Sequence, residues 1–443
     1  MRLNWFSPLP PQRTDIAHYT ARIAAALAER FEVTFWTHQP ADSAFLPPGA
    51  MLRRYRPGDV GDAVFRRSVF AGLNVYNLGN DARFHAAIAD VALAVPGLVI
   101  LHDTRLHHFV FERSRADEPP FASYLALARE TYGPEGEATA RRIAESEGRL
   151  IDAHVEAMPF VEPFLAAAVG AVCHSSAAAA EVRQRSDAPL LTLPLPFASL
   201  APPAPSGRAW APPWRFVMYG YINANRRLEE ILRALADWPE APDFHLDVYG
   251  VLWDEAGVRQ LVERSGLAGR VRLHGYAPEA PLDAAIADAH LAFNLRHPTM
   301  GEASGGILRA WAVATPALVT NAGWYAGLPD AAAWKISVEA EAADIRRAVL
   351  ELARHPARFS AMGVAAQARL QALHAPSRYA GALRAALADR PRLMAHFAAR
   401  RLGRRARDHA AAPAEWSGER GRVTRLADAL FGIGLSGTAG AET

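Results

Sequence analysis

Short apolar runs alternate with helix-period segments through most of this chain, and no other feature restricts its fold as strongly. A strand buried on both faces reads as a short continuous apolar run, and a crossover helix must precede the next parallel strand. The first half predicts strands at 2–6, 32–37, 75–79, 98–102, 171–175 and 190–195, with helices at 15–29, 81–93 and 136–157. The second half predicts strands at 215–220, 244–250, 270–275, 290–295 and 316–320, with helices at 227–237, 254–265, 280–288 and 304–314. We therefore expect parallel sheets built from strand–helix–strand units.

A segment rich in proline, alanine and serine, residues 194–214, separates the two series and marks a domain boundary. The sequence thus predicts an α/β fold with two Rossmann-like domains that face each other across a cleft. The expected divisions are an N-terminal domain at 1–196, a linker at 197–213, a C-terminal domain at 214–375, a helix at 376–390 that crosses back to the N-terminal domain, and a basic, alanine-rich tail at 391–443.

Composition excludes several classes of protein. The chain is 51% hydrophobic and 21% charged, which suits substantial cores, and its net charge of +2 argues against a nucleic-acid partner. Cys173 is the only cysteine, so no intrachain disulfide can form and a reducing compartment is expected. The first eleven residues are interrupted by prolines, unlike a secretory signal, and no run of about 18 apolar residues occurs. We expect a cytoplasmic protein.

The tail at 391–443 combines many arginines with Leu393, Met394, Phe397 and Leu402. A basic amphipathic helix of this kind can rest on an anionic membrane surface, which would place the protein at the inner face of the membrane. A solvated helix is the alternative.

Several loops follow predicted strands, and ligands in open α/β sheets bind beyond the carboxyl ends of strands. The first loop reads FSPLPPQRTDIAHYT, from residue 6, and leads into a helix whose cap is Thr14 or Asp15. It lacks the G-x-G-x-x-G fingerprint, which disfavours an NAD-dependent oxidoreductase. It is either a plain capped turn or a loop that faces the cleft.

The second loop, LHDTRLHHF at 101–109, brings together His102, Asp103, His107 and His108. A zinc site normally adds cysteines or an H-E-x-x-H pair, and neither is present, so we predict no metal site. A histidine–aspartate pair at a strand end can contact a polar substrate or act as an acid and base. Core or surface histidines are the alternative.

The third loop, GYINANRRLEEIL at 220–232, places Gly220, Asn225, Arg226 and Arg227 at a helix start. Backbone N–H groups at a helix N-terminus, together with an arginine fork, suit a diphosphate. The alternative is a pair of surface arginines bound to Glu229 or Glu230.

The fourth loop, HPTMGEASGGILRAW at 297–311, surrounds one acid, Glu302, with Gly301, Ser304, Gly305 and Gly306. The small residues leave amides open to phosphate oxygens, whereas the carboxylate would repel phosphate and suits sugar hydroxyls. A capped turn with an incidental glutamate is the alternative. Because no D-x-D pair occurs, neutralisation of a diphosphate would fall to arginines and helix N-termini.

These loops, together with VYNLGNDARFH at 75–85, resemble the retaining, nucleotide-sugar-dependent glycosyltransferases of the GT-B fold, family-4 type, which include bacterial enzymes of polysaccharide biosynthesis. The resemblance spans about residues 1–390 and follows the family's order of motifs. It implies a hexosyltransferase whose C-terminal domain binds a UDP- or GDP-type nucleotide sugar as substrate, with no cofactor. The N-terminal domain would bind a glycan or lipid-linked acceptor.

Carried over by position, the resemblance assigns catalytic roles to Glu302, His102 and Arg226. The expected donor-binding residues are Gly220, Asn225, Arg227, Arg296, Ser304, Gly305, Gly306 and Arg309, and the expected acceptor-side residues are Thr14, Asp15, Asp103 and His107. The chain departs from the family at Tyr221, Asp15 and Ala310, where the family has arginine, glycine and a second glutamate. One residue is missing from the family's spacing before Thr315, so either Ala310 or Arg309 takes the place of the second glutamate. Another GT-B enzyme, such as a nucleotide-sugar epimerase or a phosphorylase, and a non-catalytic relative that binds nucleotide sugars are the competing hypotheses.

Overall fold

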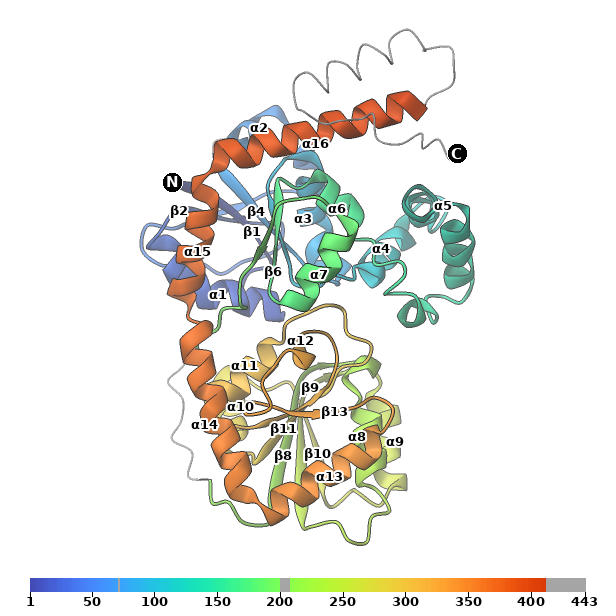
Figure 1. Cartoon of the computed structure of the whole chain (residues 1–443), viewed down its shortest axis with the longest axis vertical. Helices are drawn as coiled ribbons and strands as arrows, with labels where there is room; N and C mark the ends of the chain where they lie inside the picture. Colours follow the sequence, from blue (N-terminus) through green and yellow to red (C-terminus); the bar gives the residue numbers. More distant parts are fainter. Residues whose placement is uncertain (71, 200–207, 412–443) are drawn as a thin grey trace, which may run out of the picture.

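Two parallel β-sheets form the centres of two domains stacked along the long axis of the molecule (Figure 1). The computed structural model describes residues 1–70, 72–199 and 208–411, with side chains described up to residue 406. The α/β architecture with two Rossmann-like domains, expected from the alternating pattern, is confirmed.

The N-terminal sheet has seven strands in the order β3-β2-β1-β4-β5-β6-β7, every neighbouring pair parallel. The strands are β1 (Arg2–Phe6), β2 (Glu32–Thr37), β3 (Met51–Arg54), β4 (Leu73–Leu78), β5 (Leu98–Leu101), β6 (Gly170–Cys173) and β7 (Leu190–Thr192). The helices are α1 (Asp15–Ala28), α2 (Ala63–Phe70), α3 (Ala82–Ala94), α4 (His107–Arg113), α5 (Ala122–Glu145), α6 (Glu162–Ala167) and α7 (Ser176–Arg185).

The C-terminal sheet has six parallel strands in the order β10-β9-β8-β11-β12-β13. The strands are β8 (Trp214–Ile222), β9 (Phe244–Leu252), β10 (Val271–Gly275), β11 (Leu291–Asn294), β12 (Ala317–Thr320) and β13 (Trp334–Ile336). The helices are α8 (Leu228–Leu235), α9 (Glu255–Arg264), α10 (Glu279–Asp288), α11 (Gly305–Ala312), α12 (Gly323–Ala326) and α13 (Glu341–Arg354), and a short 3-10 helix, η4 (Ala224–Arg226), precedes α8.

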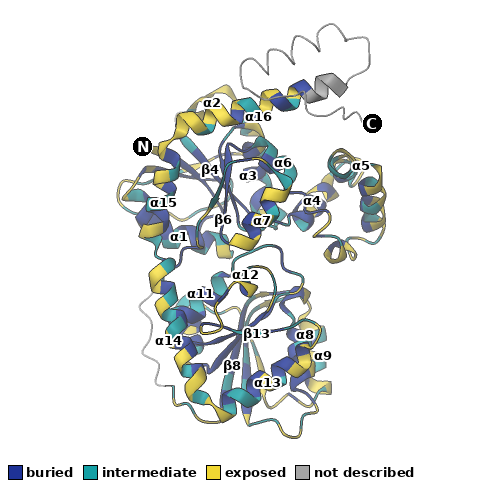
Figure 2. Cartoon of the chain, in the orientation of Figure 1, coloured by how far each residue is buried: buried dark blue, intermediate teal, exposed yellow. Residues whose placement is uncertain are grey.

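Helices cover both faces of the central strands, and burial follows from this arrangement (Figure 2). All residues of β5, β6, β11 and β12 are buried, which explains why these strands read as unbroken apolar runs. The edge strand β3, with sequence MLRR, is largely exposed. An exposed edge strand does not need an apolar sequence, so the pattern did not reveal it.

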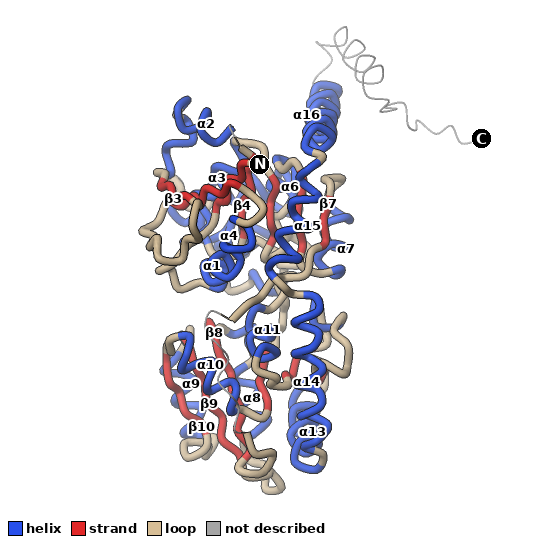
Figure 3. Tube along the Cα trace, turned by 90° about the vertical axis from the view of Figure 1, so that its left-hand side faces the viewer, coloured by secondary structure: helices blue, strands red, loops and turns tan. Residues whose placement is uncertain are grey.

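The C-terminal helices return the chain to the first domain. Helix α14 (Pro356–Leu373) packs on α11, and α15 (Pro376–Ala388) packs on α1, where the Tyr19 and Tyr379 hydroxyls lie 3.0 Å apart. Figure 3 shows α14 and α15 on one side of the molecule, spanning both domains.

Helix α16 (Arg390–Ala411) follows α15, and Arg400 and Arg404 donate to the carbonyl groups of Leu165, Ala168 and Ala166 at the end of α6. Cations at a helix C-terminus satisfy its free carbonyl groups and its dipole. Part of the predicted tail is therefore a docked helix, and residues 412–443 lie outside the described residues. None of the described helices is long and apolar enough to span a membrane.

The predicted helix at 136–157 is wrong in position, because α5 begins at Ala122 and ends at Glu145. Within α5, Gly133 has φ 73° and Pro134 follows, so the helix is kinked at this point. The kink interrupts the helical spacing of the apolar residues, so the sequence pattern revealed only the second half of α5.

Candidate active site

The carboxyl edges of the two sheets meet at a direct backbone contact. The N–H groups of Thr104 and Arg105, in the loop after β5, donate to the Met300 carbonyl over 2.9 and 3.1 Å. Nη1 of Arg105 also donates to the Thr299 carbonyl over 2.8 Å. These contacts bring the second and fourth predicted loops together, although they are about 200 residues apart in the sequence.

Arg226 ends η4, directly beyond β8, and is only 4% exposed. Its Nη2 donates to the Tyr219 carbonyl over 2.8 Å, whereas Nε is buried without a hydrogen-bond partner among the described residues. Burial, and secondarily the charge of Arg296, lowers the pKa of Arg226 to about 10. Two cations held close together in a buried place provide a site for an anion.

Arg226, Arg296 and Glu302 together form what we call the charge cluster. Nε of Arg296 lies 3.2 Å from Oε1 of Glu302, and Nη1 of Arg296 donates to Oδ1 of Asn225 over 3.2 Å. Burial lowers the pKa of Arg296, but the Glu302 carboxylate, Tyr325 and Asp15 together outweigh this, and the net shift is upward. Oε2 of Glu302 accepts from the Met300 N–H over 2.6 Å, whereas Oε1 receives no hydrogen bond from the described residues.

The N-terminus of α11 opens beside Glu302. Ser304 is the N-cap, and its Oγ accepts from the Ile307 N–H over 3.2 Å and from Nδ2 of Asn294 over 3.2 Å. A Cβ atom added at Gly305 would meet no atom within 4 Å, so open space lies beside this turn. An anion can therefore approach the first amides of the helix.

His102 and Asp103 stand on the N-terminal side of the contact. Because the Asn77 amide donates through Nδ2 to the Phe6 carbonyl, its Oδ1 must accept from Nε2 of His102, 3.0 Å away. Nδ1 of His102 is then an acceptor. Burial, followed by the nearby His174 and His85, lowers the pKa of His102 well below its usual range, so the imidazole is neutral.

The Asp103 carboxyl accepts from the Asn80 N–H over 2.8 Å. Burial raises the pKa of Asp103 to about 7, and the facing Glu302 carboxylate adds to this effect. Thr14 caps α1 by accepting from the Ala17 N–H over 3.0 Å. Asp15 is exposed at the same helix start, and its charge acts on Asp103, Arg226 and Arg296. The first loop thus lies near the cluster.

Several known proteins are similar to this chain in sequence or in fold. Residues 226–385, which include Arg226, Arg296 and Glu302, match the glycosyl transferase-like family. HepE from Anabaena in complex with UDP and glucose is 14% identical, with a TM-score of 0.59 over 88% of this chain and 99% of that one. Sucrose-phosphate synthase from Thermosynechococcus elongatus is 17% identical, with a TM-score of 0.60 over 89% and 99%.

WaaG, a glycosyltransferase involved in lipopolysaccharide biosynthesis, is 15% identical, with a TM-score of 0.53 over 85% of this chain and 98% of that one. No curated protein matches the chain. The chain therefore has the GT-B fold of these glycosyltransferases, and its residues 226–385 are similar to a glycosyl transferase-like family.

Three predicted site residues of this GT-B fold have protein partners that define their roles differently. His107 is fully buried, its Nε2 lies 2.7 Å from the Tyr124 hydroxyl, and its ring packs edge-on against Phe160. The structure therefore places His107 in the core, and the expected acceptor-side position is corrected. The first turn of α4 turns this histidine inward, away from the loop that carries His102.

Arg227 does not face the charge cluster. It adopts φ 63°, and its guanidinium binds Glu341 at 2.7 Å and Glu230 at 3.3 Å. The alternative of a surface arginine paired with Glu230 therefore describes Arg227, whereas Arg226 turns into the site.

Arg309 is held by acids of the C-terminal domain. Its Nε lies 2.5 Å from Asp283, and its Nη1 lies 2.9 Å from Glu279, which also binds His18 and Arg22 of the N-terminal domain at 3.1 and 2.9 Å. Burial alone would raise the pKa of Glu279, but the hydrogen bond to His18 and the charges of Arg309 and Arg22 lower it to about 2. Arg309 therefore serves an ion-pair network between the domains rather than presenting a free guanidinium to a donor.

Sequence reasoning missed Tyr325 and Asn294. Tyr325, on α12, is fully buried, and its hydroxyl lies in the charge cluster without a hydrogen-bond partner among the described residues. Burial and the Glu302 carboxylate raise its pKa. The run NAGWYAG around Tyr325 reads as a turn, and only the fold brings it beside Arg296. Among the described residues, no group of histidines, cysteines or acids is suited to a metal ion.

Replacing Asp103 by asparagine is expected to flatten the dependence of stability on pH. The folded protein titrates Asp103 near 7, whereas the unfolded chain titrates it near ~4. Between these values folding takes up a proton, so the contribution of Asp103 to stability falls as the pH rises toward 7. Thermal unfolding at intervals from acidic to alkaline pH should show the wild-type protein losing more stability than Asp103→Asn. Parallel curves would contradict the raised pKa.

Proposed function

We propose that this enzyme transfers a hexose-type sugar from a UDP- or GDP-type nucleotide sugar to a glycan or lipid-linked acceptor, with retention at the anomeric carbon and without a metal ion. The observation that carries the proposal is the pairing of the buried guanidinium of Arg226 and the largely buried one of Arg296, 18% exposed, with Glu302 beside the open N-terminus of α11. The cations and amides match a diphosphate, and the carboxylate matches a sugar's hydroxyl groups.

In the proposed complex, the donor diphosphate lies against Arg226, Arg296 and the amides of Gly305 and Gly306. The free Nε–H of Arg226 would donate to a phosphate oxygen. Oε1 of Glu302, which has no hydrogen bond, would accept from a hydroxyl group of the transferred sugar. Gly220 and Asn225 would shape the same pocket, the latter by holding Arg296.

The acceptor would enter from the N-terminal side, past the loop that holds Thr14 and Asp15. Nδ1 of His102, which is an acceptor in this tautomer, would accept from a sugar hydroxyl. The acceptor oxygen forms a bond to the anomeric carbon, the bond from that carbon to the β-phosphate oxygen breaks, and the hydroxyl proton passes to the departing diphosphate. Fixed cations that face the developing phosphate charge lower the barrier.

The related structures support this choice of donor, and the family resemblance supports retention. HepE was solved with UDP and glucose and also with UDP-glucose, and WaaG takes part in lipopolysaccharide biosynthesis. Two guanidiniums at the expected diphosphate position suit a reaction without a metal ion.

Thermal unfolding with a panel of UDP- and GDP-sugars tests the donor. A ligand at 100 times its Kd adds about 2.7 kcal/mol, so the right donor should raise the Tm clearly. The best donor is then incubated with glycan and lipid-linked acceptors, with and without EDTA, and NMR reads the anomeric configuration of the product. We expect a retained linkage that is insensitive to EDTA. A new free sugar formed without acceptor would favour an epimerase, and binding without turnover would favour a non-catalytic relative.

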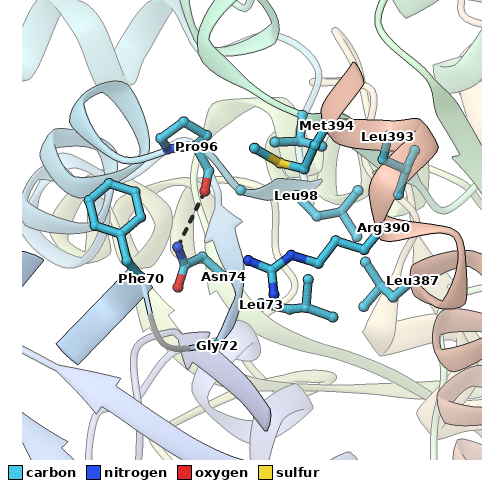
Figure 4. A pocket seen from close by; sticks show the side chains of 12 residues that line it. Phe70, Gly72, Leu73, Asn74, Pro96, Leu98, Leu387, Arg390, Leu393 and Met394 are labelled. Carbon is cyan, nitrogen blue, oxygen red and sulfur yellow. Dashed lines mark hydrogen bonds between the residues drawn. The ribbon is translucent and has the colours of Figure 1, made fainter. Parts of the chain in front are cut away.

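We also propose that the end of the N-terminal domain farthest from the C-terminal domain contacts the inner face of the membrane. Exposed arginines on α2 and α16, Arg66, Arg67, Arg392 and Arg401, accompany the exposed side chains of Val64, Phe70, Met394 and Leu402. Figure 4 shows an apolar pocket between these helices, lined by Phe70, Leu73, Leu98, Leu387, Leu393 and Met394, with Arg390 beside it. Basic and apolar side chains together suit an anionic bilayer surface.

Sedimentation with lipid vesicles measures this contact. We expect binding to vesicles that contain phosphatidylglycerol, little binding to pure phosphatidylcholine, and a loss of binding in Arg392→Gln/Arg401→Gln. The control Arg264→Gln/Arg354→Gln removes two exposed arginines of the C-terminal domain and should bind normally. Equal loss in both variants would contradict a specific surface.

A further inference from the structure

Three large side chains project into solvent where β8 and β9 end. Tyr221 is 45% exposed, Val251 is 51% exposed and Trp253 is 76% exposed. Exposed apolar groups that gather beside a polar site commonly mark a binding surface.

The strand pairing fixes how these side chains lie. Tyr221 is directly opposite Val251 in the parallel ladder, and the Trp253 N–H donates to the Ile222 carbonyl over 2.9 Å. Residues paired across two strands have neighbouring side chains on one face of the sheet. The three residues therefore form one patch, which we call the aromatic platform.

The aromatic platform borders the proposed donor site. Gly220, immediately before Tyr221, would point a Cβ atom at Nη2 of Arg226, 4.0 Å away. Tyr221 stands where related enzymes have an arginine, so the chain has exchanged a cation for a flat apolar ring at this position.

On the N-terminal side, Arg83 and Asp81 form an exposed ion pair at the start of α3. Arg83 binds Asp81 through Nη2 at 2.7 Å and through Nε at 3.1 Å, and its side chain is 69% exposed. The hydrogen bonds to Asp81 raise the pKa of Arg83, and the Tyr221 hydroxyl is close enough to contribute. The platform and this ion pair thus meet from opposite domains.

We propose that the aromatic platform and the Arg83–Asp81 pair bind a sugar ring of the acceptor next to the attacking hydroxyl, which makes the acceptor a carbohydrate. This inference rests on the proposed function. A pyranose presents a face of C–H groups that packs on an aromatic ring, and its equatorial hydroxyls both donate and accept hydrogen bonds. Trp253 offers the ring, Arg83 offers donors and Asp81 offers acceptors.

Residues of both domains build this subsite, which favours an acceptor sugar over the donor's nucleobase as its occupant. The proposed donor contacts, Arg226, Arg296, Glu302 and α11, all belong to the C-terminal domain. The acceptor must touch both domains, because the reaction occurs between them. A ring held on Trp253 with its hydroxyls on Arg83 and Asp81 meets this requirement.

Fluorine NMR of the whole protein labelled with 5-fluorotryptophan tests the inference directly. The chain has 10 tryptophans, and Trp253→Phe assigns the signal of Trp253. Trp324, next to Tyr325 of the charge cluster, reports on the donor site and is assigned by Trp324→Phe. The probes are UDP, GDP, a panel of methyl glycosides and disaccharides, and geranyl phosphate, with each saccharide added both alone and with the nucleotide.

We expect saccharides to shift the Trp253 signal and nucleotides to shift the Trp324 signal. A Trp253 signal that responds to a nucleotide or to geranyl phosphate, or to none of the probes, overturns the carbohydrate subsite. A Trp324 signal that ignores every nucleotide, with no transfer detected, instead counts against the proposed function. The two failures are therefore distinguishable.

Steady-state kinetics with the acceptor found in the transfer screen gives an independent readout. Trp253→Ala should raise the acceptor KM about tenfold, as expected for one lost aromatic contact, and should leave the donor KM unchanged. Trp253→Tyr should recover most of the loss, because it keeps a ring. The control Val364→Ala shortens an exposed apolar side chain on α14, to which no binding role is assigned, and should behave as wild type. An unchanged acceptor KM in Trp253→Ala overturns the proposal.

Discussion

Replacing Glu302 by glutamine is expected to lower kcat/KM for sugar transfer by about 10²–10³-fold while the protein remains folded. Oε2 of Glu302 accepts from the Met300 N–H at 2.6 Å, and the glutamine oxygen can accept the same bond. The negative charge that balances Arg296 at 3.2 Å is lost, as is a charge-assisted acceptor for the sugar. Transfer rates with the best donor measure the loss, and thermal unfolding checks the fold.

The matched control is Glu339→Gln, which neutralises an exposed carboxylate of the same domain and should keep normal turnover. A second readout follows from the charge of Glu302, which helps to raise the pKa of Asp103 to about 7. In Glu302→Gln the pKa of Asp103 should fall, so the loss of stability with rising pH should be smaller and should end at a lower pH. Near-normal turnover together with an unchanged pH profile would contradict the assigned position of Glu302.

The sequence predicts buried elements of this fold better than exposed ones. Strands such as β5 and β11 lie between helices, and their apolar runs follow directly from that burial. β3 at the sheet edge and β13, with only three residues, carry arginine or lysine and leave no such pattern. The local pattern of apolar residues thus indicates burial, and it reveals a strand only where that strand is buried.

The site was predictable where its residues act through local backbone geometry. Ser304 caps α11 and Thr14 caps α1, and both follow from residue type and position. Arg226 and Arg227 are adjacent, and one is 4% exposed in the charge cluster while the other pairs with Glu341, 114 residues away. Their different directions depend on the αL conformation at Arg227, with φ 63°, which the sequence does not indicate for an arginine.

Arg309 illustrates a second limit. Its helix places it in the position next to the family's second glutamate, and that placement alone suggests contact with a donor. Its partners Asp283 and Glu279 lie on α10, and Glu279 receives His18 and Arg22 from α1 of the other domain. This network forms only where the two domains come together, so the order of motifs along the sequence cannot reveal it.

The contact between the two domains also underlies the second large effect. Gly301→Ala is expected to lower turnover by about 10²-fold while donor binding to the C-terminal domain is kept. Gly301 has φ 78°, which disfavours a residue with a side chain, and an added Cβ would lie 1.8 Å from Oγ1 and 2.9 Å from Cβ of Thr104. Thr104 cannot easily turn away, because its Oγ1 donates to Glu181 at 2.9 Å and its N–H donates to Met300. The clash would therefore separate the domains and misalign acceptor and donor.

The rescue experiment distinguishes this clash from general damage. In Gly301→Ala/Thr104→Gly, the Oγ1 and Cβ atoms that the new methyl group would meet are absent, and the nearest remaining Thr104 atom is the backbone nitrogen at 3.2 Å. The double variant should regain much of the turnover, short of wild type because the backbone strain at residue 301 persists. Thr104→Gly alone controls for the lost bond to Glu181. Small-angle X-ray scattering should give a larger radius of gyration for Gly301→Ala than for the double variant, and equal radii with equal turnover would show that residue 301 does not limit the approach of the domains.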